Sequence, residues 1–221
     1  MQIAIDGPAG SGKSTIAKLV ANRLGFIYCD TGAMYRTVTV MAHQLGLDYG
    51  DEAAIMAALA KLQIKFAPSP DGQKVFMNDQ DVTLTIREPE TTNNVSQVSA
   101  LPKVREELVA RQRDIAASHD IVMDGRDIGT TVLPNAEVKV FMVASVQARA
   151  ARRHKENVAK GIMTSVATLE EEIAARDHKD TTRAVSPLKK APDAVEIDST
   201  NMTIDEEVQK ILDLVAAKKG E

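Results

Sequence analysis

Apolar positions along the chain alternate between short continuous runs and longer segments with helical spacing. The runs have the length of buried strands and cover residues 3–5, 26–28, 121–123, 138–143 and 194–197. Helical spacing fills the gaps, first over Ile16, Leu19, Val20 and Leu24, then through about residue 45, and later over 103–117, 145–159, 168–178 and 204–217. Short strands separated by helices predict an α/β fold with a parallel sheet covered on both faces.

One segment, from about residue 63 to residue 84, breaks this rhythm. Short alternating runs are joined there by turn residues at 68–72 and 78–79, which is typical of an antiparallel hairpin. We interpret the segment as a small antiparallel insertion on the parallel core. It fits a flap that grips a substrate, and it fits a plain surface hairpin equally well. The length of 221 residues favours one domain with insertions.

Composition and charge narrow the class of protein. The formal charge of −4 argues against a general nucleic-acid binder, although nine of the twelve arginines lie between Arg105 and Arg183. Clustered arginines suit planar contacts with a small polyanion. We find no apolar run near the roughly 18 residues of a membrane helix and no signal sequence. The single cysteine, Cys29, fits a reducing compartment, so we expect a cytoplasmic protein without membrane association.

The segment 7–14 reads GPAGSGKS and matches the phosphate-binding pattern G-x-x-x-x-G-K-[ST]. Its glycines let backbone N–H groups turn toward phosphate oxygens, while Lys13 reaches the β- and γ-phosphates and Ser14 binds Mg²⁺. A predicted strand precedes the segment and a predicted helix follows it, which is the context that the pattern requires. The predicted nucleotide-binding residues are Gly7, Pro8, Ala9, Gly10, Ser11, Gly12, Lys13, Ser14 and Thr15.

Three aspartates, Asp6, Asp30 and Asp124, each close a predicted strand. The carboxyl ends of parallel strands form the edge where ligands bind in such folds, so we expect these aspartates around one crevice. Acidic strand-end residues face Mg²⁺ in many phosphate-loop enzymes. The predicted metal ligands are therefore Ser14, Asp30 and Asp124, and the choice between the two aspartates stays open. No Cys/His cluster has the spacing of a zinc site.

The segment Asp30–Arg36 follows the second predicted strand. A hydroxyl at the start of a helix, from Thr31, and an arginine about one turn later can together hold a second anion or a polar ring. An ordinary N-cap, in which Asp30 or Thr31 accepts hydrogen bonds from helix N–H groups, explains the local sequence equally well.

Two further segments concentrate charge. In the segment Asp124–Thr130, Arg126 can clasp a phosphate, and Asp127 can accept hydrogen bonds from the exocyclic amine of a base. The segment 176–183 reads RDHKDTTR, and arginines near a transferring phosphoryl group neutralise the charge of the transition state. Without a ligand, the first segment would be a tight turn and the second a solvated helix end.

Taken together, these motifs resemble those of bacterial cytidylate kinases, phosphate-loop enzymes that transfer the γ-phosphate of ATP to CMP or dCMP. The resemblance covers nearly the whole chain and rests on residues 7–15, 30–36, 104–106, 124–130, 176–177, 180, 183–187 and 198–200. It implies the three-layer fold of nucleoside monophosphate kinases with a parallel five-stranded sheet. It also implies a core of residues 1–62, 85–150 and 168–221, a β insertion at about 63–84 and a mobile lid at about 151–167.

The resemblance also implies roles for individual residues. Arg149, Arg152 and Arg153 lie at the start of the lid segment, where arginines of the family reach the ATP phosphates, and we expect Arg152 and Arg153 to bind ATP. The implied monophosphate site consists of Thr31, Arg36, Arg105, Arg126, Asp127, Arg176, Asp180 and Arg183. The implied catalytic residues are Lys13, Arg126, Arg176 and Arg183. Lys179 stands where some relatives carry arginine, and Thr31 where relatives can carry serine.

The expected reaction is direct in-line transfer with Mg²⁺, ATP and a cytidine monophosphate as the small-molecule partners, in a monomer. Such transfer depends on positioning and electrostatics and needs no general base with a tuned pKa. Two alternatives stay open. One is a kinase for another acceptor, such as a different nucleotide or shikimate. The other is a nucleotide-dependent switch, although the sequence lacks an Asn-Lys-x-Asp guanine-reading motif.

Overall fold

The computed structural model describes residues 1–69, 72–159 and 161–220. Within it the chain forms two compact units, Met1–Cys29 with Ala116–Glu221 as the first and Asp30–Ile115 as the second. The predicted partition into one core, an insertion and a lid stays a prediction.

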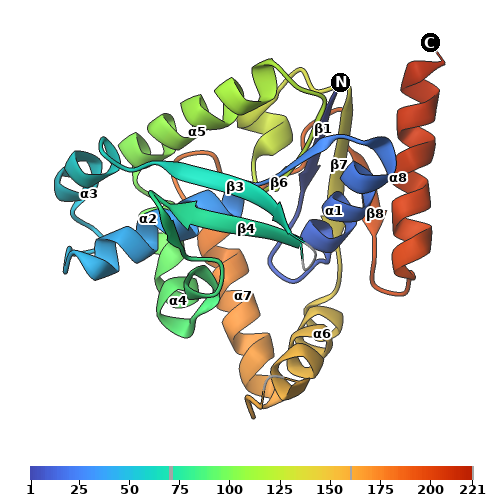
Figure 1. Ribbon diagram of the computed structural model, residues 1–221. Helices are drawn as coiled ribbons and strands as arrows, with labels where there is room; N and C mark the ends of the chain where they lie inside the picture. Colours follow the sequence, from blue (N-terminus) through green and yellow to red (C-terminus); the bar gives the residue numbers. More distant parts are fainter. Residues whose placement is uncertain (70–71, 160, 221) are drawn as a thin grey trace. The chain divides into compact units, whose positions relative to one another are not determined.

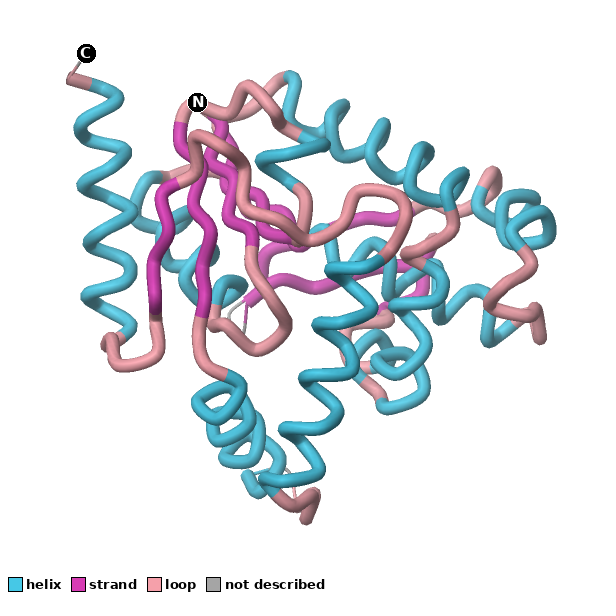
Figure 2. The backbone as a smooth tube through the Cα atoms, turned by 180° about the vertical axis from the view of Figure 1, so that it is seen from behind, coloured by secondary structure: helices cyan, strands magenta, loops and turns pink. Residues whose placement is uncertain are grey.

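The first unit is built on a five-stranded sheet with the order β2-β6-β1-β7-β8 (Figures 1 and 2). In the centre, β1 runs parallel to β6 and β7, with Ile3 opposite Val122 on one side and Val138 on the other. All three side chains are buried, because a parallel sheet covered by helices has no solvent face. The α/β class with a parallel five-stranded sheet is therefore confirmed. The strands are β1 (Gln2–Asp6), β2 (Ile27–Asp30), β6 (Ile121–Gly125), β7 (Val138–Val143) and β8 (Val195–Asp198).

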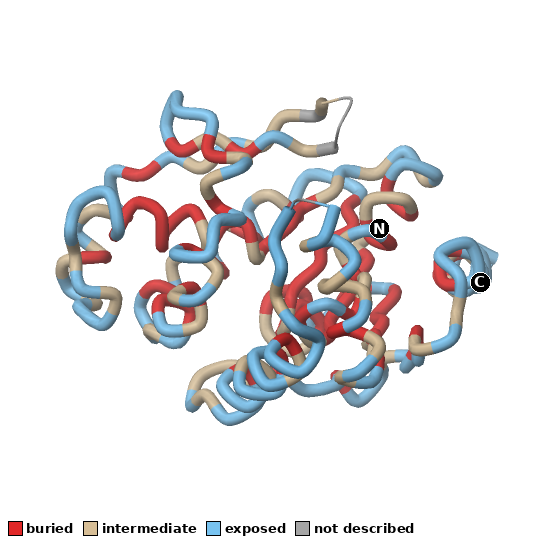
Figure 3. Tube along the Cα trace, turned by 90° about the horizontal axis from the view of Figure 1, so that it is seen from below, coloured by how far each residue is buried: buried red, intermediate tan, exposed pale blue. Residues whose placement is uncertain are grey.

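Helices complete the first unit, and each long one was predicted to within a few residues. Apolar side chains of α1 and α8 form one core cluster with the strands. Figure 3 colours the backbone by burial, and buried residues alternate with exposed ones along the helices. The pair α6 and α7 has a small cluster of its own around Ala150, Leu169 and Ile173. The bounds are α1 (Lys13–Leu24), the single-turn η2 (Ile128–Val132), α6 (Val146–Ala159), α7 (Val166–Thr182) and α8 (Ile204–Lys219).

The second unit contains a small antiparallel sheet with the order β3-β4-β5. Ile64 pairs with Met77 and Phe66 with Val75, which confirms the predicted antiparallel insertion. Residues 70 and 71 of the predicted turn at 68–72 lie outside the described residues. The elements of this unit are α2 (Thr31–Gln44), α3 (Glu52–Leu59), β3 (Ile64–Ser69), β4 (Gly72–Met77), β5 (Gln80–Asp81), η1 (Thr85–Arg87), α4 (Pro89–Val98) and most of α5 (Pro102–Ala117).

The helices α3 and α4 and the turn η1 were not predicted from the sequence. Their start signals are nevertheless present, because Asp51 caps α3 by accepting a hydrogen bond from the N–H of Ala54, and Pro89 stands in the first turn of α4. None of the helices formed by the described residues combines the length and the apolar character needed to cross a membrane.

Candidate active site

The phosphate loop joins β1 to α1, and its glycines are required by geometry. A Cβ on Gly7 would lie 2.2 Å from the carbonyl oxygen of Met142, so only glycine fits against β7. Gly10 and Gly12 have φ angles of +77° and +89°, in the left-handed region that favours glycine. Gly12 is the N-cap of α1 and supplies no side chain for its N–H groups. The start of α1 therefore presents backbone donors suited to an anion.

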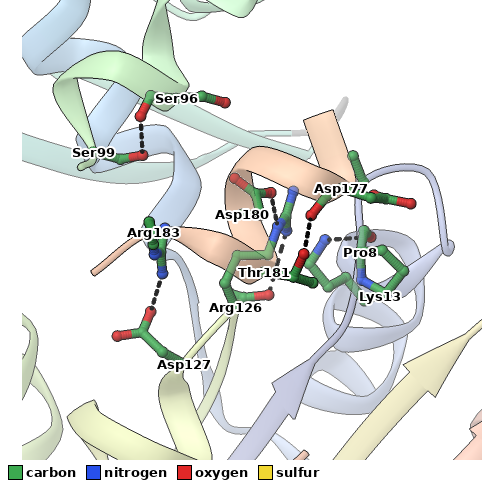
Figure 4. A network of polar contacts seen from close by, with 12 residues as sticks. Pro8, Lys13, Ser96, Ser99, Arg126, Asp127, Asp177, Asp180, Thr181 and Arg183 are labelled. Carbon is green, nitrogen blue, oxygen red and sulfur yellow. Dashed lines mark hydrogen bonds and ion pairs between the residues drawn. The ribbon is translucent and has the colours of Figure 1, made fainter. Parts of the chain in front are cut away.

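Lys13 and Ser14 follow the loop in the first turn of α1. Lys13 is buried, and its Nζ donates to the carbonyl oxygen of Pro8 at 3.3 Å (Figure 4). The Ser14 hydroxyl donates to Oδ2 of Asp124 at 2.7 Å, and the Tyr28 hydroxyl donates to Oδ1 of the same carboxylate at 2.8 Å. The loop thus places a hydroxyl directly beside the buried carboxylate near the end of β6.

Asp30, the other strand-end candidate, has local partners in the second unit. Its Oδ1 accepts a hydrogen bond from the N–H of Ala33 at 2.8 Å and caps α2, while its Oδ2 accepts from Nη2 of Arg36 at 2.9 Å. The N-cap interpretation of this segment is therefore confirmed for Asp30. Thr31 is buried in the first turn of α2. Arg36 is oriented by the cap, so capping and anion binding can coexist here.

Arg105 of α5 is also buried within the second unit. Its guanidinium carbon lies 5.2 Å from the centre of the Tyr35 ring, and its Nη1 donates to the carbonyl oxygen of Ser99 at 3.1 Å. The aromatic face and the carbonyl hold this cation in one orientation. Arg36 and Arg105 are thus both fixed by neighbours in their own unit, and the sequence alone did not show these neighbours.

Three predicted arginines of the first unit gather around one carboxylate, Asp180 of α7. Arg126 donates from Nε to its Oδ2 at 2.9 Å (Figure 4). Burial raises the pKa of Asp180, but the positive charges of Arg126, Arg176 and Arg183 outweigh it, so that its pKa is lowered. The carboxylate is therefore ionised at neutral pH. Arg126, Arg176 and Arg183, separated by up to 57 positions along the chain, share one neighbourhood.

The guanidinium group of Arg183 has two partners, a backbone carbonyl and a carboxylate. Its Nε donates to the carbonyl oxygen of Ser186 at 2.8 Å, its Nη2 donates to the same oxygen, and Nη2 lies 3.4 Å from Oδ1 of Asp127 (Figure 4). Ser186 has a φ of +48° directly before Pro187, a conformation that costs free energy for a residue with a Cβ. The strained turn presents its carbonyl to the arginine and fixes the guanidinium beside Asp127.

Asp6 closes β1 and holds the segment that carries Asp127. Its two carboxylate oxygens accept hydrogen bonds from the N–H groups of Ile128 and Gly129, both at 2.8 Å. Burial is the main cause that raises the pKa of Asp6 to about 7, and the negative charge of Asp127 adds to this rise. The two backbone hydrogen bonds and the positive charge of Lys13 act in the opposite direction. Lys13 and Asp127 therefore both lie close enough to Asp6 for their charges to act on it. Asp6 therefore holds the backbone that follows Asp127 in place.

The arginines of α6 have partners as well. Arg149 donates to the carbonyl oxygen of Ala9 and to Asp177, and Arg152 donates from Nη1 to Oγ of Ser199 at 3.2 Å. Arg153 is half-buried on the same helix. Sequence reasoning missed the partners Asp177 and Tyr28. Asp177 belongs to the charged segment 176–183, but no local sequence pattern predicts its ion pair with Arg149, which lies 28 positions away.

Comparisons of the sequence with known proteins indicate one family. A model of the cytidylate kinase family matches residues 3–217. A cytidylate kinase from Ligilactobacillus salivarius (strain UCC118) is 58% identical over 215 residues, covering 97% of this chain and 96% of the relative. A cytidylate kinase from Lactiplantibacillus plantarum is 57% identical over 220 residues, covering 100% and 96%. Among solved structures, a gluconokinase from Sinorhizobium meliloti 1021 matches at a TM-score of 0.51 and 14% identity, covering 99% of this chain and 94% of the other, and shares the fold alone.

Proposed function

The chain belongs to the cytidylate kinase family, and on that premise we propose that it transfers the γ-phosphoryl group of ATP to CMP and dCMP. The observation that carries the proposal is the pairing of two anion-binding arrangements in the first unit. One is the glycine loop with Lys13, and the other is the arginine cluster around Asp180. A switch protein needs only the first of these. A kinase with an anionic acceptor needs both.

In the proposed reaction an oxygen of the acceptor phosphate attacks the γ-phosphorus, and the bond from that phosphorus to the β–γ bridging oxygen of ATP breaks. ADP leaves with the electron pair of that bond. Lys13 and the loop N–H groups hold the triphosphate, and the positive charges of Arg126, Arg176 and Arg183 stabilise the transferring group. Asp127 accepts hydrogen bonds from the exocyclic amine of cytosine, and Asp180 binds the ribose hydroxyls.

Mg²⁺ fits beside Ser14. Among the described residues no group of three or more His, Cys, Asp and Glu side chains is arranged to hold a metal ion. The hydroxyl of Ser14 and the carboxylate of Asp124 nevertheless lie 2.7 Å apart, and both present the oxygen atoms that Mg²⁺ prefers. We propose these two residues, rather than the capped Asp30, as the protein side of the metal site. When bound, Mg²⁺ neutralises phosphate charge.

Other parts of the proposal rest on the family resemblance. Two of them concern contacts: Arg152 and Arg153 bind the ATP phosphates, and Thr31, Arg36 and Arg105 bind the acceptor. A third is the movement of residues 151–167 as a lid; residue 160 of this segment lies outside the described residues. The last two are the monomeric state and the cytoplasmic location.

The proposal is tested with wild-type protein, ATP, Mg²⁺ and a set of acceptors: CMP, dCMP, UMP, AMP and shikimate. We expect CDP and dCDP as the main products, and transfer to shikimate or AMP alone would contradict the proposal. Asp127→Ala should raise the KM for CMP about 10- to 100-fold, since a hydrogen bond to a charged group contributes roughly 1.5–3 kcal/mol. The KM for ATP should change little.

The control for this variant is Asp213→Ala, which removes an exposed carboxylate on α8. It should leave both KM values at their wild-type level. Equal increases of the two KM values in Asp127→Ala would show that this residue supports the fold of the site and does not distinguish CMP from ATP.

A further inference from the structure

Arg149 is a buried cation at the point where α6 approaches the phosphate loop. It is 4% exposed, and its guanidinium contacts three different segments. Nε donates to the carbonyl oxygen of Ala144 at 3.0 Å, Nη1 donates to the carbonyl oxygen of Ala9 at 3.0 Å, and both Nη atoms donate to the carboxylate of Asp177 at 3.1 and 2.6 Å. One side chain thus links the end of β7, the phosphate loop and α7.

These bonds leave Arg149 little capacity for a nucleotide. An arginine has five N–H donors, and four of them are used by the bonds to Ala144, Ala9 and Asp177. A bidentate grip on a phosphate needs two donors that point in the same direction. The geometry therefore differs from the role that the family resemblance implies for arginines of this segment, which is direct contact with the ATP phosphates.

The phosphate loop itself rests on the Arg149 side chain. A Cβ on Gly10 would lie 3.4 Å from Cβ of Arg149 and 3.8 Å from its Cγ, so the aliphatic part of the arginine lies against the loop backbone. Ala9 and Gly10 form the apex of the loop, where glycine allows many backbone conformations. A fixed carbonyl partner and a packed side chain together select one of these conformations.

The other partner, Asp177, stands next to Arg176 and three positions before Asp180 on α7. Residues three apart lie on neighbouring positions of a helix surface. Holding Asp177 therefore also holds the backbone that carries Arg176 and Asp180. Because the pair is largely buried, with 4% and 21% of the two side chains exposed, breaking it leaves an unpaired charge in a poorly solvated place.

We infer that Arg149 and Asp177 form a positioning pair that fixes the apex of the phosphate loop to α7. The pair thereby sets the place of Lys13, at one end of the loop, relative to Arg176 and Asp180. It touches neither nucleotide and acts through the residues that it holds. This inference rests on the proposed function, because it assigns the pair a part in phosphoryl transfer.

The test is a double-mutant cycle with Arg149→Lys, Asp177→Asn and the double variant. Lysine keeps the charge but cannot reach all three partners, and asparagine keeps the size but removes the carboxylate charge. Each single variant should lower kcat about 10- to 100-fold, since small misplacements of reacting groups have effects of this size. The KM values should change less than about threefold. The kcat of the double variant should be no lower than that of the more impaired single variant, because both changes break the same pair.

A matched control is the exposed pair Arg23 and Asp205, whose side chains are 52% and 89% exposed and lie 3.5 Å apart. Arg23→Lys and Asp205→Asn should leave kcat and both KM values unchanged. Thermal unfolding of each variant shows whether it is folded. If Arg149→Lys does not fold, Asp177→Asn decides alone, and a normal kcat in that variant overturns the inference.

Two other results would also overturn it. The first is a reduction of kcat in the double variant that equals the product of the reductions in the two single variants. The second is a loss confined to the KM for ATP in Arg149→Lys with a normal Asp177→Asn, which would mean direct contact of Arg149 with the nucleotide. Hydrogen exchange of the amides of residues 9–12 gives a readout without substrate. It should be faster in both single variants than in the wild type, and unchanged exchange counts against the pair.

The failure of the proposed function is distinguishable from the failure of the pair. A wild-type protein that does not phosphorylate CMP contradicts the function, and the hydrogen-exchange comparison still decides whether Arg149 and Asp177 fix the loop.

Discussion

Replacement of the buried Asp6 by asparagine should change how the stability of the protein depends on pH. Asp6 is 4% exposed, and burial raises its pKa from 3.8 to about 7. A carboxyl group whose pKa is higher in the folded than in the unfolded protein binds more protons when folded. Its contribution to stability is therefore fully present below pH 3.8 and is lost as the pH rises through about 7.

The magnitude follows from the two pKa values. Ionisation of a group whose pKa shifts from 3.8 to about 7 lowers the free energy of unfolding by roughly 2 kcal/mol at pH 5 and roughly 4 kcal/mol at pH 7. Between these pH values the wild type should lose about 2 kcal/mol through Asp6 alone. The asparagine of the variant cannot titrate. Its single side-chain oxygen can accept only one of the two N–H groups at Ile128 and Gly129, so the variant has a constant cost of about 1–3 kcal/mol.

The assay is urea unfolding of both proteins at pH 5, 6, 7 and 8, followed by circular dichroism. The quantity of interest is the difference in the free energy of unfolding between Asp6→Asn and the wild type. It should shift by about 2 kcal/mol in favour of the variant from pH 5 to pH 7 and change little above pH 8. Other carboxylates, including Asp180 with its lowered pKa, are present in both proteins and cancel in this difference.

A difference that stays constant from pH 5 to pH 8 would refute the reasoning, because it would mean that Asp6 is ionised throughout that range in the folded protein. Asp205→Asn, at an exposed position of α8, serves as the control and should show a constant difference.

Two further predictions concern the phosphate loop and a helix cap. Gly7→Ala should lower kcat by at least about 100-fold, because the new Cβ would lie 2.2 Å from the carbonyl oxygen of Met142 and the loop would have to move. Gly46→Ala is the control, since φ is also positive there but no atom lies within 4 Å of the new Cβ, and it should keep the wild-type kcat. Equal kcat values in the two variants would contradict the argument. Thr203→Ala should lower the free energy of unfolding by about 1 kcal/mol without changing kcat, because Thr203 and Glu206 form the capping box of α8, and an unchanged urea midpoint would show that the box contributes nothing.

Much of the fold could be read from local patterns. Apolar runs such as Ile3–Ile5 are buried wherever a parallel sheet is covered by helices, so their positions and lengths predicted the strands of the first unit. The helix α3 was not predicted because its sequence EAAIMAAL is apolar almost throughout and so shows no helical alternation of apolar and polar positions. The helix α4 was not predicted because its apolar positions are few. The start signals of the two helices, Asp51 and Pro89, are also common in turns.

The sequence by itself determined the phosphate loop, because its chemistry depends on neighbouring residues: Gly7, Gly10 and Gly12 set the backbone, and Lys13 and Ser14 follow at once. Only the tertiary structure decided which distant groups support that loop. Arg149 lies 140 positions from Ala9, and Asp180 is 54 positions from Arg126, yet each pair is joined by a hydrogen bond. Such contacts form when strands and helices pack, because a hydrogen bond or an ion pair depends on distance in space and follows no spacing rule along the chain.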